Sequence, residues 1–296
     1  MLRCMHTFRD LAHLGPACSE LRGRFGALAL VPTMGALHSG HEALVRAAAV
    51  SGAGVVASIF VNPLQFGPND DLAKYPRDEA GDLAKLEAWG CHALWMPDVV
   101  TMYPPGESTT VVVGGPAENW EGSARPEHFR GVATVCAKLF GQVRPDTAYF
   151  GQKDWQQLQV VQRMVADLLL SPKIVGIPTV REPDGLALSS RNRFLEPAQR
   201  AIAPRLFAIL QSIALALAGG RSVADVLAVA MRDLTAHAFA VDYLALVDGA
   251  SLSQLQTVQP GARLIAAARL SSVRLLDNVA VTPIQAQGNG RQYRST

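Results

Sequence analysis

Two histidines, His38 and His41, are the side chains whose type and spacing point most directly to chemistry. They end the decapeptide PTMGALHSGH, which follows the apolar run 27–31 and leads into a segment with helical spacing. The free N–H groups and positive dipole end of a helix N-terminus attract anions, and Gly35 and Gly40 allow close backbone approach. Because residues three apart lie on the same side of a helix, both imidazoles can contact phosphate oxygens. The sequence therefore predicts a phosphate site.

Ordinary surface or capping histidines are the alternative interpretation of an H-x-x-H pair. The strand, glycine turn and helix start around this pair favour the phosphate site. Zinc binding is less favoured, because no third ligand lies nearby at a spacing typical of metal sites.

Neutral amides follow the second apolar run, 55–61. Asn62 and Gln65 come directly after it, at the end of an expected strand, where open α/β sheets bind their ligands. Amide groups suit hydroxyls and carboxylates better than metal ions, although turn-forming amides are the alternative. We therefore expect a pocket for a polar organic group beside the phosphate site.

Two cationic side chains, Lys153 and Arg191, lie in two further expected turns. Lys153 lies where a strand ends and a helix begins, with Asp154 as the expected N-cap. The segment 188–191, Leu-Ser-Ser-Arg, combines two hydroxyls with the Arg191 guanidinium, a combination that can hold a triphosphate. A solvated lysine and a polar connecting loop are the alternatives.

The segments that must position these residues alternate between short apolar runs and longer stretches with helical spacing. This alternation is typical of a parallel sheet with helices on both faces, and it predicts a Rossmann-like domain over residues 1–181. The expected strands are 27–31, 55–61, 93–96, 109–113, 147–150 and 174–180, and the expected helices are 40–49, 78–89, 129–143 and 155–168.

The composition shifts after Pro183-Asp184-Gly185. An Ala- and Leu-rich helix is expected over 197–218, and a second helix is expected to begin at Ser222. Three strand-like runs follow, and the last two are spaced as an antiparallel hairpin. They predict a smaller α+β domain over residues 182–284 and a flexible tail over 285–296; the expected strands are 243–247, 262–267 and 273–281.

The composition excludes several classes of protein. The 296 residues carry 27 Lys and Arg against 25 Asp and Glu, so a net charge of +2 gives no field that would favour nucleic acid or an anionic membrane. Arg3, Arg9 and Asp10 precede any apolar run of signal-peptide length, and the longest apolar run, 206–218, is too short to span a membrane. Both observations predict a cytoplasmic protein. The four cysteines lie far apart and are expected to be reduced packing residues; they are Cys4, Cys18, Cys91 and Cys136.

The histidine decapeptide resembles the HxGH signature of the nucleotidylyltransferase superfamily, which class I aminoacyl-tRNA synthetases share. Further segments, in the right order between about 27 and 195, resemble the pantothenate synthetase family. They are SIFVNPLQFG (58–67), YPR (75–77), MYP (102–104), HFRGV (128–132), FGQKDWQQ (150–157), PTVRE (178–182) and LSSRN (188–192).

This resemblance implies an ATP-dependent ligase that joins pantoate to β-alanine through a pantoyl adenylate, with Mg²⁺, in a cytoplasmic homodimer. It implies charge stabilisation on the phosphates by His38, His41, Lys153 and Arg191. It places ATP against Met34, Gly35, Ala36, Leu37, Ser39, Gly40, Gly151, Gln152, Asp154, Val180, Leu188, Ser189 and Ser190, the substrates against Asn62, Gln65, Arg125, His128 and Gln157, and the metal near Asp82.

Three positions depart from the commonest family pattern. Gln152 stands in place of a glutamate, Trp155 in place of a tyrosine and Leu188 in place of a methionine. The first change removes a negative charge beside Lys153, so ATP affinity or pH dependence is expected to differ. The long, turn-rich stretch 114–131 is expected to be a mobile cover that brings Arg125 to the phosphates.

Two other functions compete with the ligase. A nucleotidylyltransferase that stops after one step would share the HxGH motif, but it would need an anion site for a phosphorylated acceptor, whereas Gln65 and Gln157 are neutral. A nucleotide-sensing or RNA-binding protein could use the same sheet without turnover. The near-neutral charge and an aromatic content of 6% argue against an extended RNA platform.

Overall fold

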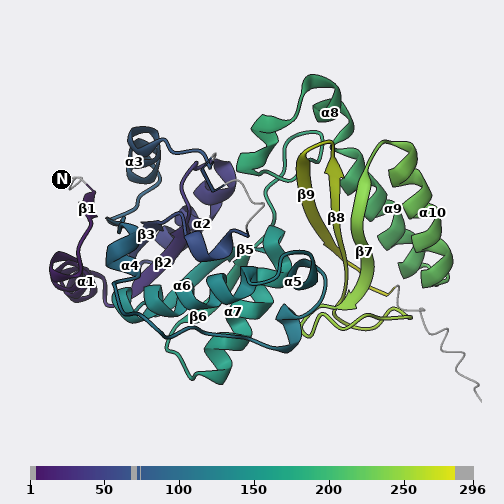
Figure 1. The fold of residues 1–296 in the computed structure, drawn as a ribbon. Helices are drawn as coiled ribbons and strands as arrows, with labels where there is room; N and C mark the ends of the chain where they lie inside the picture. The colour runs from purple at the N-terminus through teal and green to yellow at the C-terminus, as the bar shows by residue number, and fades with distance from the viewer. Residues whose placement is uncertain (1–4, 68–71, 74, 284–296) are drawn as a thin grey trace, which may run out of the picture.

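The computed structural model describes residues 5–67, 72–73 and 75–283 and contains two sheets (Figure 1). The first has six strands, all parallel, and the second has three antiparallel strands. These are the Rossmann-like sheet and the smaller α+β unit that the sequence predicts. The tail predicted over 285–296 lies outside the described residues.

The parallel sheet has the order β1-β4-β3-β2-β5-β6. β2 lies between β3 and β5 and pairs with both, so the direction of winding reverses there. The loops after β2 and β5 diverge at this reversal, which is where open α/β sheets form a ligand crevice. The strands are β1 (His6–Phe8), β2 (Leu28–Thr33), β3 (Gly54–Ile59), β4 (Ala93–Trp95), β5 (Thr147–Gly151) and β6 (Lys173–Ile177).

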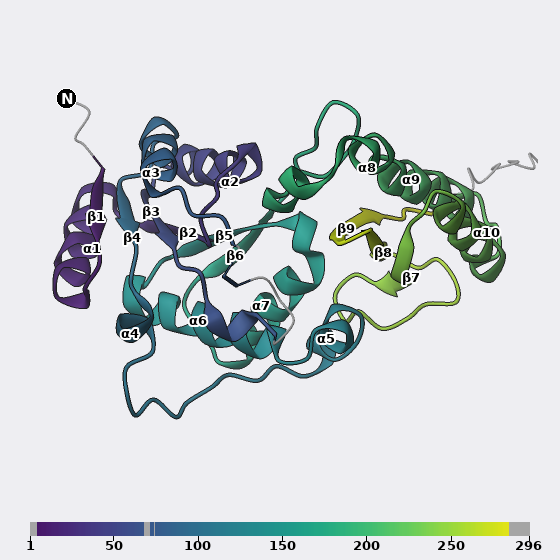
Figure 2. The same ribbon diagram turned by 45° about the horizontal axis from the view of Figure 1, so that its top comes forward.

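Helices cover both faces of this sheet (Figures 1 and 2). Alternate strand residues enter two separate cores: Leu28 and Leu30 pack under α1, α6 and α7, whereas Ala29 and Val31 pack under α2 and α3. The first group of helices is α1 (Leu11–Phe25), α6 (His128–Val143) and α7 (Trp155–Asp167); the second is α2 (Ser39–Val50) and α3 (Glu79–Ala88), and the short α4 (Val99–Met102) follows β4.

The small unit packs α9 and α10 on one face of the antiparallel sheet (Figure 2). Its elements are α8 (Pro197–Ile202), α9 (Arg205–Ala218), α10 (Val223–Ala236), β7 (Ala240–Asp248), β8 (Ala262–Leu270) and β9 (Val273–Ala280). By length and composition alone, Pro197–Ala218 could cross a membrane. Its apolar stripe, which includes Leu206, Leu210 and Leu217, is instead buried in the core of this unit.

The other face of the small sheet packs on the Rossmann-like unit. Trp155 at the start of α7 and Trp120 pack against Ala245, Val247 and Ile265. Both tryptophans also donate their indole N–H across this boundary, to Gly249 O at 2.7 Å and to Leu252 O at 2.9 Å. The two units therefore share an apolar and hydrogen-bonded interface.

Several predicted elements differ from the structure. The expected strand 109–113 is irregular, because Val111 N–H donates to the Thr134 hydroxyl on α6 and not to a strand. The expected helix 197–218 breaks around Pro204, whose ring lacks the amide proton that a continuous helix requires. β6 ends at Ile177, before Pro178, for the same reason.

The stretch 114–131, expected to be a mobile cover, is a packed segment with two short helices, η2 (Gly115–Ala117) and α5 (Glu121–Ala124). Gln156 on α7 fixes it: its amide donates to Pro116 O and Asn119 O at 2.8 and 2.7 Å and accepts from Glu121 N–H at 3.0 Å. A buried amide with three protein partners holds this segment against α7.

Candidate active site

A cleft of about 1200 Å³ opens at the carboxyl ends of β2 and β5. Residues from the loop after β2, the turn after β5 and the loop 188–191 line it together. Of the predicted site residues, Met34, His38, Gly40, His41, Gln65, Gly151, Lys153, Asp154, Gln157, Leu188, Ser189, Ser190 and Arg191 line this cleft.

His38 and His41 form the start of α2 and face one another, with ring centroids 4.2 Å apart. His38 Nδ1 accepts the Gly40 N–H at 3.1 Å, and His41 Nδ1 accepts the His38 N–H at 3.2 Å. Each ring thus satisfies a backbone donor at the helix N-terminus, so the capping interpretation describes their Nδ1 atoms. Because Nδ1 accepts in both rings, a neutral imidazole carries its proton on Nε2. Each ring can therefore offer one further donor to a ligand.

Burial keeps both imidazoles neutral. Burial, and then the nearby Lys153 ammonium, lower the pKa of His38 to about 4. Burial lowers the pKa of His41 to about 3, with His38 as the next contribution. At neutral pH the pair therefore acts through hydrogen-bond donation, and the charge at the site comes from Lys153 and Arg191.

Asp82 on α3 anchors the loop before the histidines. Its two carboxylate oxygens accept the N–H groups of Ala36 and Leu37, both at 2.8 Å, and only 1% of the residue is exposed. Gly35 has a φ of +83°, and a Cβ there would lie 3.1 Å from the Asp82 carboxylate. The loop thus turns its backbone donors toward Asp82, which anchors it, and the position of Asp82 near the metal stays a prediction.

The turn after β5 carries Lys153 at the boundary between the two units. Gln152–Asp154 form a single 3₁₀ turn, and α7 begins at Trp155. Asp154 is the N-cap by position, but its side chain makes no capping hydrogen bond. It lies 3.4 Å from the Lys153 ammonium; burial raises the pKa of Asp154, and Lys153 and Arg191 outweigh that effect and lower it.

The loop 188–191 also lines the cleft, and Leu188 lies close to Gly40 between the two histidines. Ser189 caps the 3₁₀ helix η4 (Ser190–Phe194) by accepting the Arg191 N–H at 3.2 Å. Asn192 donates to Ala187 O at 3.0 Å, and Leu188 N–H donates to Val180 O at 3.0 Å. These bonds fix the backbone of the loop, so its hydroxyls and guanidinium are presented to the cleft.

Gln65 reaches the cleft because Asn62 holds it. Asn62 is fully buried and donates to Gln65 Oε1 at 2.9 Å and to Gly131 O at 3.0 Å. Its own Oδ1 accepts from the Tyr103 hydroxyl at 2.7 Å. Asn62 therefore positions Gln65 from behind, and the fixed Oε1 leaves Nε2 as the donor that Gln65 can offer to a ligand.

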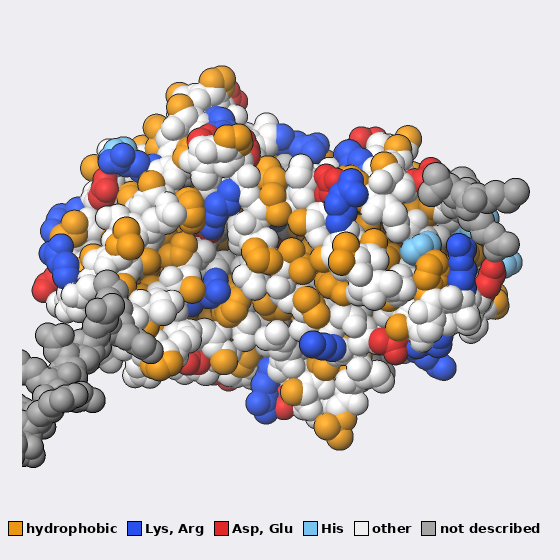
Figure 3. Space-filling view, turned by 180° about the vertical axis from the view of Figure 1, so that it is seen from behind, with side chains coloured by type: hydrophobic (Ala, Val, Ile, Leu, Met, Phe, Trp, Pro, Cys, Tyr) orange, Lys and Arg blue, Asp and Glu red, His pale blue; other side chains and the backbone are white. Residues whose placement is uncertain are grey.

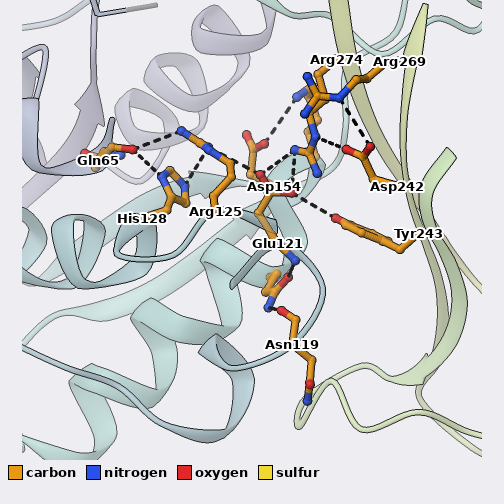
Figure 4. A network of polar contacts seen from close by, with 12 residues as sticks. Gln65, Asn119, Glu121, Arg125, His128, Asp154, Asp242, Tyr243, Arg269 and Arg274 are labelled. Atoms are coloured by element: carbon orange, nitrogen blue, oxygen red, sulfur yellow. Dashed lines mark hydrogen bonds and ion pairs between the residues drawn. The ribbon is translucent and has the colours of Figure 1, made fainter. Parts of the chain in front are cut away.

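Arg125 and His128 brace the same glutamine from the next pocket (Figure 4). The backbone carbonyl oxygen of Gln65 accepts from Arg125 Nη2 at 3.1 Å and from His128 Nδ1 at 2.9 Å. His128 Nε2 lies 3.3 Å from Arg125 Nη1, which fits a neutral ring with its proton on Nδ1. Burial, and then Arg125, lower the pKa of His128 to about 4.

The apolar wall of the cleft was not predicted, because the motifs were interpreted one at a time. Val132, Val135 and Leu139 lie on one side of α6 and line the cleft beside Phe60 and Phe150. Their helical spacing was the available signal, since it marks a continuous apolar stripe. Such a stripe predicts burial, and only the fold shows that part of it borders a cavity.

A buried ion-pair network was also missed, and it closes the neighbouring pocket from the small unit. Arg274 on β9 lies 2.7 Å from both carboxylate oxygens of Glu121 and 2.5 Å from Asp242 Oδ2 (Figure 4). The Tyr243 hydroxyl donates to Glu121 at 3.3 Å. Glu121 lies more than 100 positions before Arg274 and Tyr243 in sequence, so no local sequence motif predicts the network.

Ten predicted site residues do not line the main cleft: eight line neither pocket, and two line only the neighbouring one. Gln152 donates to Gly176 O at 3.2 Å and so faces β6, and the Val180 carbonyl bonds Leu188. The others are Gly35, Ala36, Leu37 and Ser39 in the histidine loop, and the buried supports Asn62 and Asp82; in addition, Arg125 and His128 line the neighbouring pocket.

A family comparison gives one match over almost the whole chain. The model of the family described as pantoate-beta-alanine ligase matches residues 6–280. Two relatives named pantothenate synthetase are similar throughout. That of Granulibacter bethesdensis is 57% identical and covers 93% of this chain and 96% of its own; that of Acidiphilium cryptum is 55% identical and covers 94% and 100%.

Solved structures show the same similarity in three dimensions. Pantothenate synthetase from Thermus thermophilus superposes with a TM-score of 0.89 at 48% identity, covering 94% of this chain and 100% of its own. A pantoate-beta-alanine ligase from Francisella tularensis, complexed with beta-gamma ATP and beta-alanine, gives a TM-score of 0.79 at 30% identity, covering 95% and 100%.

Proposed function

Because this chain belongs to the pantoate–β-alanine ligase family, we propose that its cleft activates pantoate as a pantoyl adenylate and transfers the pantoyl group to β-alanine. The enzyme is an ATP-dependent ligase, and its products are pantothenate, AMP and pyrophosphate. The observation that carries the assignment of residues is one cleft that joins the histidine helix start, Lys153 and Arg191 to a pocket lined by Gln65 and Gln157.

The first half-reaction takes place where the cations and the histidines face each other. A pantoate carboxylate oxygen attacks the α-phosphorus of ATP in line, and the bond to pyrophosphate breaks. Neutral His38 and His41 donate Nε2–H to phosphate oxygens, and Lys153 and Arg191 stabilise the charge that develops there. Ser189 and Ser190 add hydroxyl donors in the same cleft.

Pantoate matches the mixed polar and apolar character of the part of the cleft beside the phosphate site. Its two hydroxyls and its carboxylate suit the amides of Gln65 and Gln157, and its two methyl groups suit the apolar wall of Val132, Val135 and Leu139. Asn62, Arg125 and His128 act indirectly, because they hold Gln65 in place.

The second half-reaction needs only proximity. The neutral amine of β-alanine attacks the acyl carbon of the adenylate, the bond to the phosphate oxygen breaks, and AMP leaves while the nitrogen loses a proton. Adenylation supplies the leaving group, so no side chain becomes covalently attached. The enzyme accelerates this step by holding both reactants in one cleft.

Within 5–67, 72–73 and 75–283, no group of three or more His, Cys, Asp or Glu side chains could hold a metal ion. Both Asp82 oxygens already accept backbone N–H groups. We therefore propose that Mg²⁺ enters with the phosphates of ATP, as is usual for this ion.

The remaining proposals concern organisation. We propose a cytoplasmic homodimer, with domains at 1–181 and 182–284, that binds neither nucleic acid nor membrane. Lys and Arg side chains are interspersed with Asp and Glu on the face in Figure 3, and the net charge is +2. A surface of this kind favours neither polyanion binding nor anionic lipid.

Exchange of labelled pyrophosphate into ATP tests the proposed function. The protein is incubated with ATP, Mg²⁺ and pantoate, and β-alanine is omitted. Exchange that requires pantoate is the expected result, because it reports a reversible adenylate. Absence of exchange from folded protein would contradict the intermediate, and exchange without pantoate would favour a simple nucleotidylyltransferase.

A further inference from the structure

The turn that carries Lys153 lacks local support. It is one 3₁₀ turn, and the side chain at the α7 N-cap makes no capping bond. The backbone carbonyls of Gln152 and Lys153 face β9 of the small unit, where Asn278 Nδ2 donates to both, each at 2.9 Å. One side chain from 125 positions downstream therefore holds the turn.

The orientation of the Asn278 amide follows from its partners. The two carbonyls can only accept hydrogen bonds, and the Arg263 guanidinium, which contacts Oδ1, can only donate. Both amide protons of Asn278 therefore donate to the Lys153 turn, and its Oδ1 accepts from Arg263. Asn278 is 5% exposed, so water does not compete for these bonds.

Arg263 extends the contact to the first residue of α7. Its guanidinium lies 3.4 Å from the centroid of the Trp155 ring, and the Trp155 indole donates to Gly249 O at 2.7 Å. Asn278 and Arg263 thus contact the turn and the adjoining Trp155 from the small unit. Asn278 also borders the pocket that Lys153 lines.

We propose that Asn278 is a positioning residue for the reaction: it fixes the backbone of the Lys153 turn, so that the small unit sets where the ammonium meets the phosphates. This rests on the proposed role of Lys153. Asn278 does not itself touch the reacting atoms. The small unit thus completes a catalytic turn that belongs to the Rossmann-like unit.

The test is Asn278→Ala in the pantoate-dependent exchange assay, where a drop in kcat of roughly tenfold to a hundredfold is expected. The KM for pantoate should stay within about twofold, because Gln65 and Gln157 bind it independently of this turn. In a Lys153→Ala background, Asn278→Ala should change the remaining rate by less than about twofold, since both changes act through one group.

Trp120→Phe is the matched control. It removes another buried bond between the units, from the Trp120 indole to Leu252 O at 2.9 Å, without touching the Lys153 turn. It should keep the wild-type exchange rate. Equal losses in the two variants would show that any damage to the interface suffices, and would overturn the proposal.

Other outcomes are equally decisive. A folded Asn278→Ala protein with an unchanged kcat, or multiplicative losses in the double variant, would also overturn the proposal. If Asn278→Ala gives no cooperative melt, Asn278→Asp replaces it, because it keeps the shape and the acceptor for Arg263 but loses both donors. The same loss of kcat is expected. Wild-type protein without exchange would contradict the proposed function itself.

Discussion

The two catalytic turns of this enzyme are held in different ways. The histidine turn after β2 is stabilised from within: its own imidazoles cap α2, and Asp82 bonds its loop from the neighbouring helix. The lysine turn after β5 lacks such a cap and is stabilised by Asn278 of the small unit. One half of the phosphate site is therefore built locally, and the other half depends on how the two units pack.

Because Asp82 anchors the histidine turn, a substitution there tests the role of a side chain in the reaction with little loss of the turn itself. His41→Ala removes one donor to phosphate from a turn that Asp82 still anchors. The rate of pantoate-dependent pyrophosphate exchange is expected to fall by about 10² to 10³, the usual effect of losing one preorganised donor. Steady-state exchange kinetics measure it. His13→Ala, at an exposed position on α1, is the control, and a His41→Ala protein that keeps most of the activity would remove this histidine from the mechanism.

The buried ion pair of Glu121 and Arg274 tests how much the boundary between the units contributes to stability. Glu121→Gln removes the charge that pairs with Arg274 at 2.7 Å, and it leaves a guanidinium buried beside Asp242 alone. Breaking a buried pair on one side costs about 3 kcal/mol of unfolding free energy. Urea denaturation measures the loss.

Glu79→Gln provides the control for that loss. Glu79 pairs with Arg9 at 2.6 Å, but the two side chains are 55% and 57% exposed. An exposed pair contributes less than about 1 kcal/mol, so the control should be almost unchanged. Equal losses in the two variants would show that the Glu121 network is not a special support of the interface.

Asp82→Asn separates an anchoring role from metal binding. The new amide places a donor against one of two backbone N–H groups, and about 2 kcal/mol of unfolding free energy should be lost. Exchange should fall, because the histidine loop shifts. The Mg²⁺ concentration that gives half-maximal exchange is expected to stay the same; a large increase would restore Asp82 as a metal ligand.

The same contrast explains how far the sequence could predict the structure. The HxGH turn depends on residues within one decapeptide, so strand, glycine and helix signals sufficed to predict its place, and its chemistry stays a prediction. The clamp on Lys153 depends on Asn278, and the brace on α5 depends on Gln156. Neither has a local pattern, because a hydrogen bond to a distant backbone carbonyl leaves no periodicity in sequence.

Misplaced elements have a similar origin. The run 109–113 has the β-branched residues of a strand, but Val111 bonds Thr134 on α6, so tertiary contacts outweigh propensity. Asp82 was predicted to be near the metal because the resemblance supplies a residue type and a position. The fold adds that each of its oxygens accepts one backbone N–H, and the metal assignment stays a prediction.

The smallest expected effect concerns the pH dependence of stability. Burial lowers the pKa of His38 and His128 to about 4 and that of His41 to about 3, from 6.5 when unfolded. Between pH 6.5 and pH 4 the unfolded chain therefore binds more protons than the native one, and stability falls as the pH falls. From about pH 7 to about pH 5.5 each histidine should cost about 1 kcal/mol.

Urea denaturation at both pH values measures this change, and His41→Ala should make it smaller. Part of this loss of unfolding free energy is expected to arise in the histidine turn. His38 and His41 destabilise the histidine turn when they become charged, because Nδ1 can then no longer accept the backbone N–H groups that cap α2. A pH dependence identical in wild type and His41→Ala would mean that this ring is not held neutral in the native protein. It would contradict the conclusion that the histidine turn is stabilised by its own uncharged imidazoles.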